Sequence, residues 1–190
     1  HNTYRLLLVK AGSLLALNYP EKAYQQLQLA SELVIYTNSD NTIPSLKLSI
    51  DYYLVLNKVL EAQEKPVLAL AAQLNAFALN PDSSSDDIQA IWHKLETLTQ
   101  WQISQLVNSN PPYIKGWTQL LNYSHKFGAN AEQFSRYLRL WQQRNPIHPA
   151  MNIIEQLQQK NFPEHKLLET KVENIAILLP LSGSQKKAGL

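Results

Sequence analysis

The feature that most constrains this chain is the stretch from Tyr53 to Pro81, which has the pattern of two helices joined by a tight turn. One face of the first helix carries large side chains at Tyr53, Leu56, Val59 and Leu60. After Pro66, the facing stripe of the second helix is small: Ala69, Ala72 or Gln73, and Ala76. Small residues let two helix backbones approach closely, and a proline ends the unit because it cannot continue a helix. The pattern predicts a tetratricopeptide-type helical hairpin.

The same arrangement occurs nearer the N-terminus. Ala23 and Ala30 are separated like Ala69 and Ala76, and each matched pair lies 46 residues apart (69 − 23 and 76 − 30). This period exceeds the usual one of about 34 residues, and the polar segment 37–45 accounts for much of the excess. A further pair around Trp117 and Trp141 has aromatic side chains where alanines stood. We therefore predict an all-α, tetratricopeptide-like superhelix with eight to ten helices.

Prolines and capping residues divide this region into helices. Five prolines stand at or near expected helix starts: residues 20, 44, 66, 112 and 149. The polar loop 82–87 ends in a helix start, where Ser or Asp caps free N–H groups and carboxylates suit the positive end of the helix dipole. The last short helix is expected at 149–159.

The pattern changes near residue 160. Residues 172–179 form a short, β-branched, nearly continuous apolar run ended by Pro180, which is typical of a strand buried on both faces of a parallel sheet. A single buried strand needs neighbours to satisfy its backbone groups. We predict a helical domain at 1–160, a linker at 161–172, and the start of a truncated α/β domain at 173–190.

Charge and composition exclude several classes of protein. A net charge of +2, with no basic run longer than Lys186-Lys187, argues against a nucleic-acid partner. The absence of cysteine excludes disulfides and cysteine-ligated zinc. No apolar run approaches the roughly 20 residues of a membrane span. Because the single methionine is Met151, we expect that His1 follows processing or a cut in a longer chain.

The polar residues predict no catalytic, cofactor or metal site. The histidines have no metal-like spacing, so surface or core roles are favoured. Asp86 and Asp87 are interpreted as a helix cap, and Glu61, Glu64 and Lys65 as solvated residues at a hairpin turn. The turn 182–184 follows the expected strand, where open α/β sheets bind ligands, but it lacks a dinucleotide or phosphate-loop fingerprint.

Two features remain as candidates for binding. Stacked hairpins form a concave surface that can hold peptides or partner helices, and its candidate contacts are Tyr52, Asn57, Lys58 and Gln73. The tryptophans could stack on a sugar or a base. All but Trp101 lie on apolar helical stripes, so core packing is predicted for Trp92, Trp117 and Trp141.

Three segments in this order carry a family resemblance: the run 109–120 (SNPPYIKGWTQL), the run 141–146 (WQQRNP) and the run 175–183 (IAILLPLSG). Together, after a tetratricopeptide-like region, they resemble the LpoA family, outer-membrane lipoprotein activators of class A penicillin-binding proteins in Gram-negative bacteria. The resemblance covers the helical N-terminal domain and the first strand of a C-terminal domain of the type I periplasmic-binding-protein fold.

The resemblance implies a non-enzymatic regulator of peptidoglycan synthesis. Members are anchored on the periplasmic side of the outer membrane by a lipidated N-terminal cysteine, which this sequence lacks. They stimulate the transpeptidase activity of a bifunctional penicillin-binding protein, mainly through the C-terminal domain, most of which is absent here. Peptidoglycan is a second implied partner. The helical part would then serve as a stiff spacer or protein-interaction domain.

Two alternatives stay open at the level of sequence. One is a general periplasmic helical-repeat module that binds a peptide or protein unrelated to the cell wall. The other is the superhelical domain of a lytic transglycosylase, whose enzymes use a glutamate followed by serine, and no Glu-Ser dipeptide occurs in the 190 residues.

Overall fold

The computed structural model describes residues 2–37, 45–80 and 84–161. Within these ranges the fold is all-α, as predicted, with nine α-helices and one 3-10 helix. The elements are α1 (Asn2–Ala16), α2 (Pro20–Thr37), α3 (Leu46–Ala62), α4 (Pro66–Leu79), α5 (Ser85–Thr97), α6 (Gln100–Ser109), α7 (Ile114–Phe127), α8 (Ala131–Arg144), η2 (Pro149–Ile153) and α9 (Ile154–Asn161).

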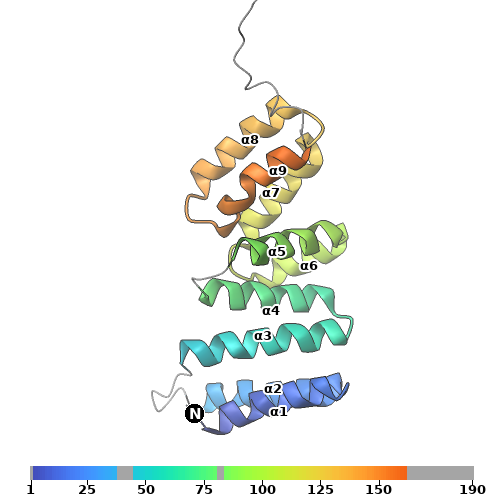
Figure 1. Ribbon diagram of the computed structural model, residues 1–190, viewed down its shortest axis with the longest axis vertical. Helices are drawn as coiled ribbons and strands as arrows, with labels where there is room; N and C mark the ends of the chain where they lie inside the picture. The colour runs from blue at the N-terminus through green and yellow to red at the C-terminus, as the bar shows by residue number, and fades with distance from the viewer. Residues whose placement is uncertain (1, 38–44, 81–83, 162–190) are drawn as a thin grey trace, which may run out of the picture.

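The helices are stacked along one long axis (Figure 1). The α1–α2 pair forms one end, the α3–α4 pair lies next to it, and α7, α8 and α9 lie at the opposite end, beyond α5 and α6. The strand expected at 172–179 and the turn at 182–184 lie outside the described residues. The domain limits proposed from the sequence therefore stay a prediction.

The hairpin that defines the repeat, α3–α4, has the most extensive contact between any two of the described elements. Val59 and Leu60 on α3 are buried, and so are the small residues Ala69, Ala72 and Ala76 on α4. Leu60, Ala69 and Ala72 form a small core between the two helices. The alanines thus allow the close approach that their spacing predicted.

The α1–α2 hairpin repeats this construction. Ala23 and Ala30 on α2 are fully buried, like their counterparts 46 residues later in α4. They pack with Leu27 and with the inner face of α1 (Tyr4, Leu8 and Ala11), and Val59 of α3 belongs to the same core. The match of buried alanines confirms the internal repeat.

Beyond α4 the regular pairing changes. Helix α6 packs on α4 and α7, whereas α5 packs on η2, α4 and α7. The third hairpin, α7–α8, forms as its pattern indicated. One continuous core joins α4 to α9 and contains Trp92, Trp117 and Trp141, each at most 2% exposed. Core packing of these three tryptophans is confirmed.

The helix ends follow the expected chemistry. Ser84 and Asp87 form a reciprocal capping box at the start of α5, which confirms the capping role of Asp87. Pro20 and Pro66 are the first residues of α2 and α4, and Pro149 begins η2. Pro112 stands two residues before α7. Pro44 lies outside the described residues.

Two of the three segments that carry the resemblance, 109–120 and 141–146, meet around a buried histidine, and the third lies outside the described residues. His148 is 5% exposed and lies edge-on to Trp117 and Trp141, with ring centroids 5.0 and 4.8 Å away. Its Nδ1 accepts a hydrogen bond from the Ala150 amide (3.1 Å), so Nε2 carries the proton and donates to the Tyr113 carbonyl (3.1 Å). Burial lowers the pKa of His148 to about 4. The neutral imidazole is therefore a core residue.

Candidate functional site

The four groove residues proposed from the sequence lie on α3 and α4 in different environments. Tyr52 is half-buried and packs near the Tyr53 and Tyr4 rings, at centroid distances of 5.3 and 6.3 Å. Burial raises the pKa of the Tyr52 phenol. Asn57 is partly buried, and its Nδ2 donates to the Ala69 carbonyl at 2.8 Å, which joins the two helices. Lys58 is exposed.

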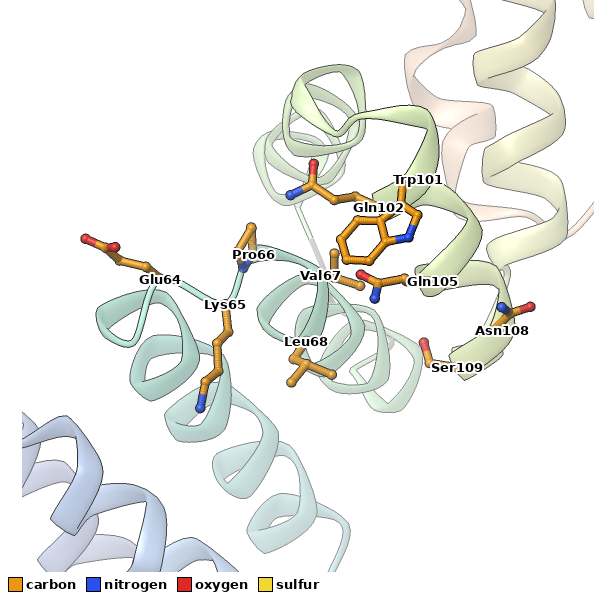
Figure 2. A pocket seen from close by; sticks show the side chains of 10 residues that line it. All are labelled: Glu64, Lys65, Pro66, Val67, Leu68, Trp101, Gln102, Gln105, Asn108 and Ser109. Atoms are coloured by element: carbon orange, nitrogen blue, oxygen red, sulfur yellow. The ribbon is translucent and has the colours of Figure 1, made fainter.

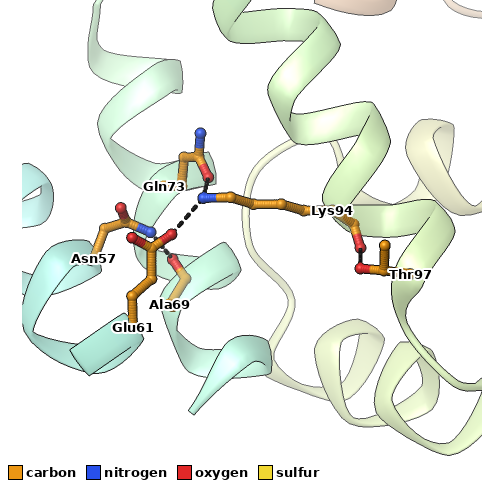
Figure 3. A network of polar contacts seen from close by, with 6 residues as sticks. All are labelled: Asn57, Glu61, Ala69, Gln73, Lys94 and Thr97. Carbon is orange, nitrogen blue, oxygen red and sulfur yellow. Dashed lines mark hydrogen bonds and ion pairs between the residues drawn. The ribbon is translucent and has the colours of Figure 1, made fainter. Parts of the chain in front are cut away.

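Gln73, the fourth residue, belongs to a polar network between α4 and α5 (Figure 3). Lys94 of α5 donates from Nζ to Gln73 Oε1 at 2.7 Å and pairs with the Glu61 carboxylate. Glu61 is exposed, as expected of a solvated residue, and it also pairs with a cation 33 residues away in the sequence. Both charged side chains remain over a third exposed, so the Lys94–Glu61 pair contributes little to stability. Its contacts join α5 to both helices of the α3–α4 hairpin.

A groove with a volume of about 580 Å³ opens between the α3–α4 turn, the start of α4 and the outer face of α6 (Figure 2). Its lining is formed by Glu64, Lys65, Pro66, Val67, Leu68, Trp101, Gln102, Gln105, Asn108 and Ser109. The four residues proposed from the sequence are not among them. The structure thus places this groove at the start of α4 and on α6, apart from the predicted contacts.

Trp101 lines the groove with the largest side chain, and its position in α6 leaves it exposed. Ile103 and Leu106 point inward and are buried, which leaves the opposite face of the helix to Trp101, Gln105 and Asn108. The capping box between Thr99 and Gln102 fixes where the helix begins. Trp101 is consequently 69% exposed. Figure 2 shows its indole on α6 facing Val67 and Leu68 on α4, with Gln105 beside it.

The polar wall of the groove consists mainly of amides. Gln102 uses its Oε1 in the capping box. Gln105 and Asn108 make no side-chain hydrogen bond with any other described residue. The two charged residues at the α3–α4 end, Glu64 and Lys65, have opposite signs. The groove is therefore close to neutral and rich in hydrogen-bonding groups.

No candidate metal site is assembled in the part of the chain that the structure describes. Its His, Cys, Asp and Glu side chains include no group of three or more that could hold a metal ion. Among the described helices, none has the length and apolarity needed to cross a membrane.

The stacked hairpins define a tetratricopeptide-like helical-repeat domain. A family model described as "LppC putative lipoprotein" matches residues 4–190. The chain therefore belongs to the LppC family.

Named relatives agree with this assignment. A protein from Pantoea ananatis called penicillin-binding protein activator LpoA is 31% identical over 94% of this chain and 25% of its own length. A protein of the same name from Glaesserella parasuis is 23% identical over 99% of this chain and 33% of its own. The chain thus spans only a quarter to a third of the length of these relatives.

Solved structures support the fold. The crystal structure of full-length LpoA from Haemophilus influenzae superimposes with a TM-score of 0.61 at 22% identity, covering 98% of this chain and 33% of that one. A monoclinic form of the same protein gives the same TM-score at 23% identity. At this level of identity the comparison establishes a shared fold.

Proposed function

We propose that residues 1–190 form the N-terminal part of a penicillin-binding protein activator, with the helical domain at 1–160. The observation that carries this proposal is the match of nearly the whole chain to relatives that bear this name. The family description supports a lipoprotein of the cell envelope. Two of the segments on which the resemblance depends, 109–120 and 141–146, contribute Tyr113, Trp117 and Trp141 to the core around His148.

The proposed partner is a bifunctional, class A penicillin-binding protein, whose transpeptidase is stimulated without any reaction catalysed by the activator. Docking is assigned mainly to an α/β domain that follows the helices, with the domain limits given above. The whole protein is placed in the periplasm, anchored to the outer membrane by a lipid. Residues 1–160 act as a spacer, because stacked hairpins are stiffer than a flexible linker.

The test compares peptide cross-linking by a class A penicillin-binding protein with three additions. These are the intact activator, residues 1–190 alone, and the activator without residues 1–160. In solution we expect the first and third to stimulate cross-linking and the second to have no effect. Full stimulation by residues 1–190 alone would contradict docking through the following domain.

The spacer role needs a test in which the anchor is present. In cells that depend on the activator, deletion of residues 1–160 should abolish growth support, and an unrelated helical solenoid of similar length should restore it. If the substitute fails although it is folded and exported, the helical domain makes a specific contact and the spacer role is wrong.

A further inference from the structure

Trp101 has an exposure that the fold does not require. Helix α6 is held by Ile103 and Leu106, which are 8% and 0% exposed, while Trp101 is 69% exposed. No aromatic ring contacts its indole among the described residues. A large aromatic side chain exposed to water is a common feature of binding sites, because covering it with a ligand gives a large favourable free energy of apolar burial.

The surroundings of Trp101 restrict the chemistry of the ligand. Val67 and Leu68 supply an aliphatic floor, and Gln105 and Asn108 supply amides whose donors and acceptors have no partner among the described side chains. The opposite charges of Glu64 and Lys65 leave no excess charge. A nucleotide or another phosphate-bearing ligand would call for a cationic wall, so a neutral ligand fits better.

We propose that this groove binds the N-acetylated amino sugars of a glycan strand. The C–H face of a pyranose ring stacks on the Trp101 indole. The planar amides of Gln105 and Asn108 pair with ring hydroxyls and with the acetamido group, and the acetyl methyl group rests on Val67 or Leu68. The volume of about 580 Å³ falls within the range of about 300–1,000 Å³ typical of small-molecule sites.

The choice of glycan rests on the proposed function, because an activator of a penicillin-binding protein works beside strands of N-acetylated sugars. The stacking geometry itself does not depend on that function. A peptide is the competing ligand class, and it is disfavoured because the groove offers one exposed ring and an amide wall without a deeply buried pocket for a side chain.

Tryptophan fluorescence of residues 1–190 tests the proposal directly. Of the four tryptophans three are buried, so iodide in solution quenches mainly Trp101. Chitotetraose, a tetramer of N-acetylglucosamine, should shift the emission to shorter wavelength and protect it from iodide. Trp101→Ala should weaken binding by about tenfold or more, measured by calorimetry, and Trp101→Phe should retain part of the affinity. Gln105→Ala should weaken it by about threefold.

The matched control is Ile147→Ala, which removes another exposed apolar side chain (86% exposed) outside the groove and should leave affinity unchanged. Circular dichroism checks that each variant is folded. Absence of chitotetraose binding, unchanged binding by Trp101→Ala, or Trp101-dependent binding of a peptidoglycan stem peptide in place of the sugar would overturn the proposal. The cross-linking assay above is independent, so failure of one proposal does not imply failure of the other.

Discussion

At the scale of single residues, Gly116 and His148 show how tightly the C-terminal core is fitted. A Cβ atom at Gly116 would lie 2.5 Å from the imidazole Nε2 and 3.2 Å from Asn145 Oδ1. The Gly116 carbonyl also accepts a hydrogen bond from Trp141 Nε1 at 2.9 Å. By contrast, a Cβ at Gly12 in α1 would have no neighbour within 4 Å. Packing therefore leaves no room for a side chain at Gly116 in α7, whereas Gly12 in α1 has space for one.

Replacing each of these glycines by alanine should change stability in opposite directions. We expect Gly116→Ala to destabilise the protein by about 1–3 kcal/mol, because the imidazole is itself buried and cannot move aside without cost. Gly12→Ala should stabilise it by about 0.5–1 kcal/mol through helix propensity. Urea denaturation monitored by circular dichroism measures both. Equal free energies of unfolding for the Gly116→Ala variant and the parent would contradict the packing described here.

The buried imidazole also makes stability depend on pH. The pKa of His148 is lowered from 6.5 to about 4 in the folded protein. Between these values the unfolded chain binds a proton at His148 that the folded chain does not. The free energy of unfolding is therefore unaffected by this group above pH 6.5 and decreases as the pH falls towards 4. The loss amounts to about 3 kcal/mol at most.

His148 is the N-cap of η2, where its side chain accepts from the Ala150 amide. The comparison variant is His148→Asn, because asparagine can also act as an N-cap but does not titrate. Its urea midpoint should fall less between pH 7 and pH 4 than that of the parent. Parallel curves for the two proteins would show that other groups produce the acid sensitivity.

At the scale of elements, α6 combines two roles that its sequence reveals only in part. Its inner residues follow helical spacing, and this spacing correctly set Trp101 apart from the other tryptophans. The groove beside Trp101 needs the α3–α4 turn, which lies more than thirty residues earlier in the chain. No pattern within the sequence of α6 predicts that it lies beside the α3–α4 turn. The contacts proposed on α3 and α4, from Tyr52 to Gln73, remain a prediction for partner binding.

At the scale of the whole molecule, the buried side chains of the described ranges form two main cores. One joins α1, α2 and α3, and the other runs from α4 to α9, with a small cluster between α3 and α4 linking them. The helices that carry these cores follow one another along the long axis (Figure 1). In stacked repeats each layer contacts only its neighbours, so stability is distributed locally.

A cavity in one core should therefore leave the other largely intact. Leu138→Ala removes a fully buried side chain of α8 and should cost about 2–5 kcal/mol. Hydrogen exchange should rise in α7 and α8 but change little in α1 and α2. An equal loss of protection in α1 and α2 would show that the molecule unfolds as a single cooperative unit.

The sequence by itself determined the helices, their starts at prolines and capping residues, the repeated alanines and the burial of three tryptophans. These features depend on spacing within one or two turns of helix, which can be read along the chain. Only the tertiary structure decided that Lys94 reaches Glu61, that α5 packs on η2 rather than on α6, and that Trp101 faces the start of α4. Those contacts join residues far apart in sequence, and which helical faces meet depends on the packing of all the layers together.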